Sequence, residues 1–341
     1  MTAWQGGAML GSSPEPLCAA YDLAMLDLDG VVYVGAKAVP GAADRIAAAR
    51  AAGMQCAFIT NNASRPPADV AAHLTELGVP AQTEDVVTSA QAACRLLLEH
   101  LGADAPVALL GGHGLEVALG EAGLVPVAVG DATAQALVTG YGPDVLWRDV
   151  MRAAVRVGDG LWWVASNTDY TIPTAYGVAP GHGMLVQSLS TFSGVQPVVA
   201  GKPSRPLLDE TVRRVGGERP LMVGDRLDTD IAGATNVGVD ALLVLTGVTG
   251  LAELVAADPE ERPTYLATEL SGLLEAHRAP EAPDEGWASG GWRATVAEGR
   301  LEVTGEGVAD DWWRAVAAAA WAHRDRTGAV AEHSGLVAPP T

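Results

Sequence analysis

The chain has 341 residues, of which 49% are hydrophobic, and it carries a formal net charge of −20 at pH 7. This length is enough for two or three domains with sizeable cores. The negative charge argues against a protein that binds nucleic acids or membrane surfaces, because both need basic patches, and no apolar run is long enough to cross a bilayer. The negative charge does not exclude an anionic ligand such as a phosphate, because one local cluster of donors and metal can outweigh the overall field.

The amino-terminal segment is rich in glycine, serine and proline and has no basic stretch of the kind that begins a signal peptide. We therefore expect a flexible tail over residues 1–16 and a cytoplasmic protein. The three cysteines, Cys18, Cys56 and Cys94, are scattered and odd in number, which is typical of small buried residues in a reducing compartment.

Apolar runs alternate with helical patterns along most of the chain, which is typical of an α/β protein. Before a long interruption, the pattern predicts strands over 23–28 and 54–60 and helices over 41–52 and 68–77. After it, residues 198–200 lead into Lys202, and the predicted elements are a helix at 206–215, a strand at 221–223, a helix at 230–237 and a strand at 241–245. In open parallel sheets of this kind, ligands bind at the carboxyl ends of the strands.

The interruption is far too long for a loop and has elements of its own. They are predicted helices at 86–101, 115–120, 146–157 and 184–192 and strands at 107–110, 135–139 and 161–165. We therefore predict a second α/β domain over residues 84–193, inserted into a core made of residues 17–83 and 194–276.

The carboxyl-terminal part changes character after a proline-rich acidic linker at 277–286. Residues 287–341 are predicted to form a small appendage with two short strands, 292–297 and 301–304, and a helix over 310–324. Its tryptophans indicate that it packs against something, which is either the rest of the chain or a partner.

Two carboxylates, Asp27 and Asp29, stand where the first predicted strand ends. Residues i and i+2 of an extended chain point the same way, so both would be aimed at one place, which is costly unless a cation shares the charge. A solvated turn is the commoner meaning of Asp-x-Asp. Here the position after an apolar strand, with Gly30 allowing a sharp turn, favours a site.

Polar groups also follow the later strands. Thr60, Asn61 and Asn62 offer a hydroxyl, two amides and backbone N–H groups to a phosphate, although an ordinary Asx turn would use the same residues. Lys202 is one of only two lysines among 21 basic residues, so a compact ammonium in a chain that otherwise uses arginine suggests a functional position. A chance surface lysine is the alternative interpretation.

A third acidic group follows the strand at 221–223. Asp225 and Asp230 suit magnesium, which prefers oxygen ligands, whereas Asp230 could instead cap the helix that follows. Asp228 is expected to be solvated.

These four motifs, in this order, resemble those of the haloacid dehalogenase superfamily. They are Asp27-Leu28-Asp29-Gly30, Thr60-Asn61-Asn62, Gly201-Lys202-Pro203 and Gly224-Asp225-Arg226-Leu227-Asp228-Thr229-Asp230. The insert between the second and third motifs is similar to that of the NagD-like phosphatases. Residues 58–65, 84–90, 223–231 and 244–248, with the extra carboxyl-terminal segment, resemble the actinobacterial glycerol 3-phosphate phosphatases. The resemblance implies a Rossmann-like, doubly wound parallel-sheet core, an inserted α/β cap of the C2 type and a small α+β appendage.

The resemblance also implies a mechanism. Asp27 attacks phosphorus, and Asp29 protonates the leaving group and then activates water. The cofactor is Mg²⁺, held by Asp27, the backbone carbonyl of Asp29 and Asp225, with Asp230 in support.

The same resemblance assigns phosphate binding to Thr60, Asn61 and Lys202, with Asn62 beside them, and gives Lys202 a part in stabilising the transition state.

The expected substrate is glycerol 3-phosphate, with nucleotides, sugar phosphates and p-nitrophenyl phosphate as alternatives. The cap segment 166–183 is expected to be a loop that faces the site. In it, Asn167 and Asp169 either contact a substrate hydroxyl or hold the loop's shape, and His182 is expected to be solvated. A hypothesis of another class is an interaction module that acts through the carboxyl-terminal tail, and a homodimer through the cap is possible.

Overall fold

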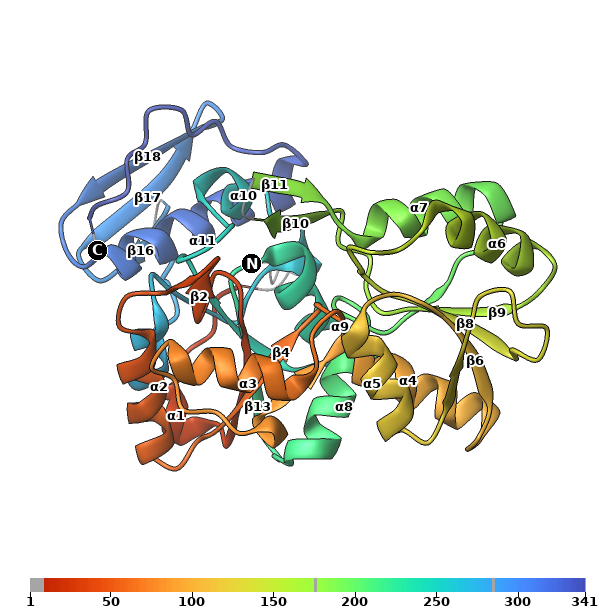
Figure 1. Ribbon diagram of the computed structural model, residues 1–341. Coiled ribbons are helices and arrows are strands. Elements are labelled where there is room, and N and C mark those ends of the chain that lie inside the picture. Colours follow the sequence, from red (N-terminus) through yellow and green to blue (C-terminus); the bar gives the residue numbers. More distant parts are fainter. Residues whose placement is uncertain (1–8, 175–176, 284–285, 341) are drawn as a thin grey trace. The chain divides into compact units, whose positions relative to one another are not determined.

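A computed structural model describes residues 9–174, 177–283 and 286–340. The described residues form two compact units, one from the two chain segments before residue 57 and after residue 216, and the other from the segment 57–216 between them (Figure 1). These boundaries differ from those of the predicted core, cap and appendage, which stay predictions. None of the described helices is both long and apolar enough to cross a membrane.

The first unit contains four parallel strands in the spatial order β15-β14-β13-β1. They are β1 (Leu23–Asp27), β13 (Pro220–Gly224), β14 (Asp240–Val244) and β15 (Tyr265–Ala267). The interiors of these strands are apolar and buried, as expected for strands covered on both faces. Its other core elements are α1 (Leu17–Ala20), β2 (Tyr33–Val34), β3 (Lys37–Ala38), α2 (Ala42–Ala51), η2 (Leu227–Ile231), α9 (Ala232–Val237), α10 (Leu251–Val255), η3 (Pro259–Glu261) and η4 (Leu270–Leu274).

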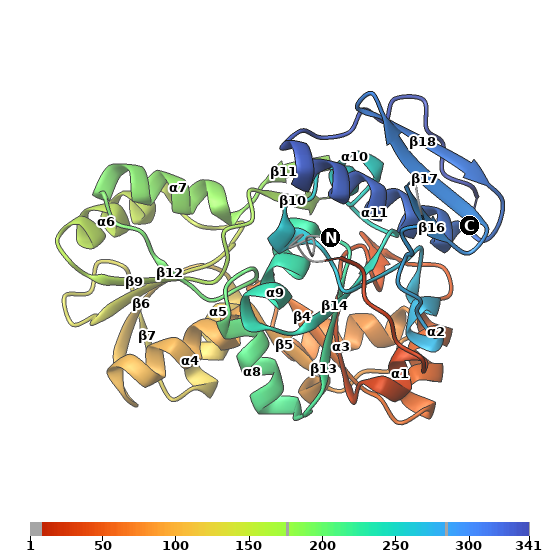
Figure 2. The same cartoon turned by 180° about the vertical axis from the view of Figure 1, so that it is seen from behind.

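The carboxyl-terminal residues complete the same unit. An antiparallel sheet of β16 (Trp287–Ser289), β17 (Trp292–Ala297) and β18 (Arg300–Gly305) packs against the long helix α11 (Ala309–Thr327) (Figure 2). Helix α11 also contacts β15 and α10. Trp312 and Trp321 are 2% and 0% exposed. The tryptophans of this helix therefore pack against the rest of the chain.

Ion pairs and hydrogen bonds fix α11 in place. Arg262 donates two hydrogen bonds to Asp325, at 2.8 and 2.6 Å, and its guanidinium lies over the ring of Trp321. The indole N–H of Trp321 donates to the carbonyl oxygen of Leu254 at 2.8 Å. These contacts join the appendage to the elements around η3 and α10.

The predicted tail and linker are also hydrogen-bonded where they are described. Residues 1–8 lie outside the described residues. Gly11 N–H donates to Thr264 O, and Ser13 exchanges two backbone hydrogen bonds with His277. Glu281 pairs in the same way with Ala288.

The second unit is an α/β fold around a parallel five-stranded sheet in the order β12-β9-β8-β6-β7. These strands are β6 (Pro106–Leu110), β7 (Val125–Val127), β8 (Ala136–Thr139), β9 (Trp162–Ala165) and β12 (Val198–Val199). Helices α6 (Trp147–Gly158) and α7 (His182–Ser193) cover one face, and α4 (Ser89–Leu101) and α5 (His113–Glu121) cover the other (Figures 1 and 2). A core that includes Leu137, Trp163 and Leu189 lies under α6 and α7.

The same unit holds a parallel pair, β4 (Gln55–Thr60) and β5 (Val86–Thr88), with the boundary between the units falling inside β4. Its remaining elements are α3 (Pro67–Glu76), η1 (Thr83–Asp85), α8 (Pro206–Val215) and a hairpin of β10 (Thr171–Thr174) and β11 (Gly177–Pro180). The α/β class predicted from the alternating pattern is confirmed.

Two local predictions are wrong. The helix expected over 86–101 begins only at Ser89, because the β-branched run Val86–Thr88 forms β5. Thr88 then closes a capping box with Gln91, which starts α4. The loop expected over 166–183 contains the β10–β11 hairpin and the first turn of α7.

Candidate active site

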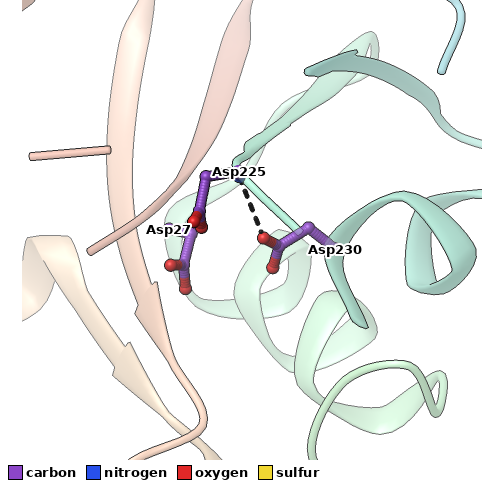
Figure 3. Close-up of side chains that lie close together, drawn as sticks. All are labelled: Asp27, Asp225 and Asp230. Atoms are coloured by element: carbon purple, nitrogen blue, oxygen red, sulfur yellow. Dashed lines mark hydrogen bonds between the residues drawn. The ribbon is translucent and has the colours of Figure 1, made fainter. Parts of the chain in front are cut away.

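Three carboxylates of the first unit lie close together. Asp27 ends β1, Asp225 follows β13, and Asp230 lies on η2 (Figure 3). Strands β1 and β13 are parallel neighbours with Leu26 opposite Val223, so their carboxyl ends meet at one edge. One oxygen of each carboxylate lies within 4.8 Å of the others. This cluster joins three of the residues predicted to hold the metal.

Backbone N–H groups orient two of these carboxylates. Asp230 Oδ2 accepts hydrogen bonds from the N–H groups of Asp225 and Arg226 at 3.2 and 3.1 Å. Asp225 Oδ2 accepts one from Val248 at 2.6 Å. Asp225 and Asp230 are 0% and 1% exposed, whereas Asp27 is partly exposed. The alternative prediction, that Asp230 caps the helix that follows, is therefore wrong. The Asp230 side chain instead binds backbone N–H groups that lie just before η2.

Glycines make room for the cluster. A Cβ at Gly30, whose φ is +87°, or at Gly247 would overlap with the Asp225 carboxylate, and a Cβ at Gly224 would overlap with Asp230. Close approach of the backbone to a buried carboxylate therefore requires glycine at these positions.

The donor set fits a hard divalent cation. Three carboxylates this close repel one another, and a cation that shares their oxygens removes that cost. Only oxygen ligands are present in the cluster, which suits Mg²⁺ or Ca²⁺ better than a softer metal. Asp228 lies outside the cluster: it is exposed and pairs with Arg226 at 2.8 Å.

The other predicted acid, Asp29, lies beyond the end of β1, in the turn that leads to β2. Its side chain is exposed, and the turn is closed by the Gly30 N–H, which donates to Tyr33 O at 2.8 Å.

The second unit brings together another predicted group. Thr60, Asn61 and Lys202 are 7%, 9% and 1% exposed. The carboxamide of Asn61 binds the backbone of Lys202 at both ends: its Oδ1 accepts from Lys202 N–H at 2.8 Å, and its Nδ2 donates to Lys202 O at 3.0 Å. Asn62 forms the Asx turn that was the alternative reading, since its Oδ1 accepts from the N–H and hydroxyl of Ser64.

Two residues of the segment 166–183, Asn167 and Asp169, support this group. Asn167 is 3% exposed, and its Nδ2 donates to Asn61 O at 2.7 Å. Asn167 Oδ1 accepts from Asp169 N–H at 3.1 Å, and Asp169 Oδ1 accepts from Asn61 Nδ2 at 3.1 Å. These contacts use the polar atoms of Asn167 to hold the shape of the segment, which was one of the two predicted roles.

The expectation of a solvated His182 is wrong. His182 begins α7 and is 4% exposed. Its Nδ1 lies 2.8 Å from the carbonyl oxygen of Asn167 and must donate to it, because a carbonyl only accepts. Burial lowers the pKa of His182 to about 4, against the smaller opposing effect of this hydrogen bond. Its neighbours Gly181 and Gly183 suggested an exposed loop, but a Cβ at either would overlap with the backbone of residues 168–171.

Sequence reasoning missed two donors in this network and at the cluster. Ser89 Oγ, at the start of α4, donates to Asn61 O at 2.6 Å, and Thr246 Oγ1 donates to Gly30 O at 2.5 Å. Neither belongs to one of the four motifs, but Ser89 lies in segment 84–90 and Thr246 in segment 244–248, and the family resemblance of these segments was a signal that could have found them.

Comparisons with known proteins agree with the motifs. Models of haloacid dehalogenase-like hydrolases match residues 24–125 and 199–273. The chain is 40% identical to the D-glycerol 3-phosphate phosphatase of Mycobacterium tuberculosis over 89% of this chain and 87% of that protein. It is 33% identical to a 5'-nucleotidase of Bacillus subtilis over 72% of this chain and 95% of that protein. The crystal structure of a glycerol phosphate phosphatase from Mycobacterium tuberculosis in complex with magnesium has a TM-score of 0.82 and 39% identity, covering 90% of this chain and 92% of that chain.

Proposed function

This chain belongs to the haloacid dehalogenase-like hydrolase family, and on that premise we propose that it is a magnesium-dependent phosphatase that hydrolyses glycerol 3-phosphate. The observation that carries the proposal is the cluster of Asp27, Asp225 and Asp230 within 4.8 Å at the ends of neighbouring strands. The name of the 40% identical relative supports glycerol 3-phosphate as the substrate.

The carboxylates of the cluster have different exposures, which fits a division of roles. Asp225 and Asp230 are buried and fixed by backbone N–H groups, so they suit metal binding. Asp27 is partly exposed and can present an oxygen to a substrate as well. Mg²⁺, held by Asp27, Asp225, the backbone carbonyl of Asp29 and, in support, Asp230, would offset the repulsion between the carboxylates and the phosphoryl group.

Asp27 is the proposed nucleophile. Its carboxylate oxygen attacks phosphorus, the bond from phosphorus to the ester oxygen breaks, and Asp29 donates a proton to that oxygen, releasing the alcohol. A water molecule then attacks the phosphorus of the aspartyl phosphate while Asp29 takes its proton. Cleavage of the phosphorus–Asp27 bond releases inorganic phosphate and restores both carboxyl groups.

Phosphate recognition is proposed for the second group of residues. The Thr60 hydroxyl, the Asn61 backbone N–H and the Lys202 ammonium would bind phosphoryl oxygens, and Lys202 would stabilise the charge that develops on them. For Asn62, Asn167 and Asp169, the side-chain contacts within the chain support a role in shaping the site.

A 5'-nucleotide is the second candidate substrate, supported by the 33% identical nucleotidase. An interaction module acting through the carboxyl-terminal tail has less support, since Trp312 and Trp321 are buried within the first unit. Sugar phosphates and p-nitrophenyl phosphate as substrates, the homodimer and the cytoplasmic location stay predictions.

The test is phosphate release from glycerol 3-phosphate, a nucleoside monophosphate, a sugar phosphate and p-nitrophenyl phosphate, each with Mg²⁺ and with EDTA. We expect metal-dependent release, fastest with glycerol 3-phosphate and abolished by Asp27→Asn. A faster reaction with the nucleotide would make the nucleotide the preferred substrate and leave the proposed mechanism unchanged. Release that persists in EDTA or in Asp27→Asn would refute the mechanism.

A further inference from the structure

We propose that Asn61 is a positioning residue that acts through Lys202: its side chain fixes the backbone of Lys202 and thereby the place of the ammonium group. The inference rests on the proposed role of Lys202 in binding the phosphoryl group. It gives the Asn61 side chain a different task from the phosphate contact expected from the motif.

The first argument is the pair of hydrogen bonds between Asn61 and Lys202. One carboxamide accepts from the N–H and donates to the C=O of the same residue, 141 positions away in the chain. These two bonds satisfy the backbone N–H and C=O groups of Lys202, as a neighbouring strand does for a residue in a sheet. The pattern also fixes the orientation of the amide, because only Oδ1 can accept from an N–H and only Nδ2 can donate to a carbonyl.

The second argument is that the donors of the Asn61 side chain are fully used. A carboxamide has two N–H donors, and here one meets Lys202 O and the other meets Asp169 Oδ1 at 3.1 Å. A phosphate oxygen needs a donor, so it would have to displace one of these partners. The Asn61 side chain is therefore a support, and the backbone N–H of Asn61 is the group left for phosphate.

The third argument is that Asn61 is itself anchored from two directions. Its carbonyl oxygen accepts from Ser89 Oγ at 2.6 Å and from Asn167 Nδ2 at 2.7 Å. The carbonyl of Asn167 in turn accepts from His182. Asn61 thus links Lys202 to α4 through Ser89 and to the segment before α7 through Asn167.

Gly201 supplies independent support. A Cβ at Gly201 would lie 2.5 Å from Asn61 Oδ1 and 2.6 Å from Ser166 O. The glycine of Gly201-Lys202-Pro203 is therefore needed for the carboxamide to reach the backbone. Gly201→Ala should consequently reproduce the effect of losing Asn61.

The first test is a double-mutant cycle with Asn61→Ala, Lys202→Met and the double variant, measured as kcat and KM with p-nitrophenyl phosphate or glycerol 3-phosphate. Misplacement of a binding group by about 1 Å can cost about 100-fold in rate, so we expect Asn61→Ala to lower kcat/KM about 10- to 100-fold in the wild-type background. In the Lys202→Met background the loss should fall below about threefold. Equal losses in both backgrounds would overturn the inference and leave the proposed function intact.

The second test does not need turnover. The chain has two lysines, Lys37, which is exposed, and Lys202, which is 1% exposed. Protein made with ¹³Cε-lysine should therefore give two side-chain signals, assigned with Lys202→Met. We expect Asn61→Ala and Gly201→Ala to shift or broaden the Lys202 signal and to leave that of Lys37 in place, whereas Asn236→Ala, at an exposed asparagine on α9, should change neither.

An unchanged Lys202 signal in both variants would overturn the inference. If the wild-type chain hydrolysed no phosphomonoester, the proposed function would fall, while the lysine spectrum would still decide whether Asn61 positions Lys202.

Discussion

The carboxylate cluster should destabilise the protein when no metal is bound. Two unit charges 4.8 Å apart repel each other by about 3 kcal/mol at an effective dielectric constant of 20. Asp27 faces two such neighbours, but it is partly exposed and therefore partly screened. Replacing it by the isosteric asparagine removes these repulsions without changing the shape of the side chain. We expect Asp27→Asn to raise the free energy of unfolding in EDTA by about 1–3 kcal/mol.

Magnesium should reverse the order of stability. A metal that binds only the folded wild-type chain stabilises it by about 2.7 kcal/mol at 100 times its dissociation constant. Asp27→Asn offers a neutral amide oxygen in place of a charged carboxylate and should gain much less. Thermal and urea unfolding of both proteins, in EDTA and across a Mg²⁺ titration, measure these differences.

Asp228→Asn is the matched control, because Asp228 lies in the same acidic stretch but is exposed and paired with Arg226. It removes the same charge and should neither raise stability in EDTA nor weaken the response to Mg²⁺. The reasoning would be refuted if Asp27→Asn were no more stable than wild type in EDTA and kept the full Mg²⁺ response.

Three further predictions concern pH, the glycine behind the cluster and the appendage. Burial lowers the pKa of His182 to about 4 from an ordinary 6.5, so the unfolded chain takes up a proton first as the pH falls. The free energy of unfolding of wild type should therefore fall by about 3 kcal/mol between pH 6.5 and pH 4, whereas His182→Asn, which keeps a donor for Asn167 O, should not show this loss. Urea unfolding measures both, and an equal dependence of the unfolding free energy on pH in the two proteins would contradict the prediction. Gly30→Ala should abolish the Mg²⁺-induced rise in melting temperature, since its Cβ overlaps with the Asp225 carboxylate, and an unaltered rise would contradict this. Trp321→Ala should destabilise the chain by about 3–5 kcal/mol in denaturant unfolding, because a fully buried ring and its bond to Leu254 O are lost, and a loss below about 1 kcal/mol would mean that the appendage is not part of the unit's core.

The sequence was sufficient for the order of the main elements and for the position of the carboxylates. Strand, turn and helix signals placed Asp27 and Asp225 at the ends of strands, and parallel strands bring such ends to one edge. Charge alone then explains why a cluster of this kind needs a cation. For Asp27 and Asp225, local patterns placed the residues at strand ends, and the family resemblance supplied their joint role with Asp230 as metal ligands.

Other parts could not be predicted because their partners are remote in the chain. Asn61 is bound by Ser89, Asn167 and Lys202, which are 28, 106 and 141 positions away. His182 stands between two glycines and looks like an exposed loop residue, yet those glycines allow close packing against backbone. In both cases tertiary packing decides what a short polar motif does.

The arrangement of the two units also bears on how the chain folds during synthesis. Residues 57–216 of the second unit are continuous in the chain, whereas the first unit is made of two segments that the second unit separates. Strand β1 pairs with β13, which is synthesised almost two hundred residues later, and α11, which packs against β15 and α10, follows later still. Asp27 therefore meets Asp225 late in translation, and a prematurely terminated chain that lacks β13 cannot assemble its carboxylate cluster.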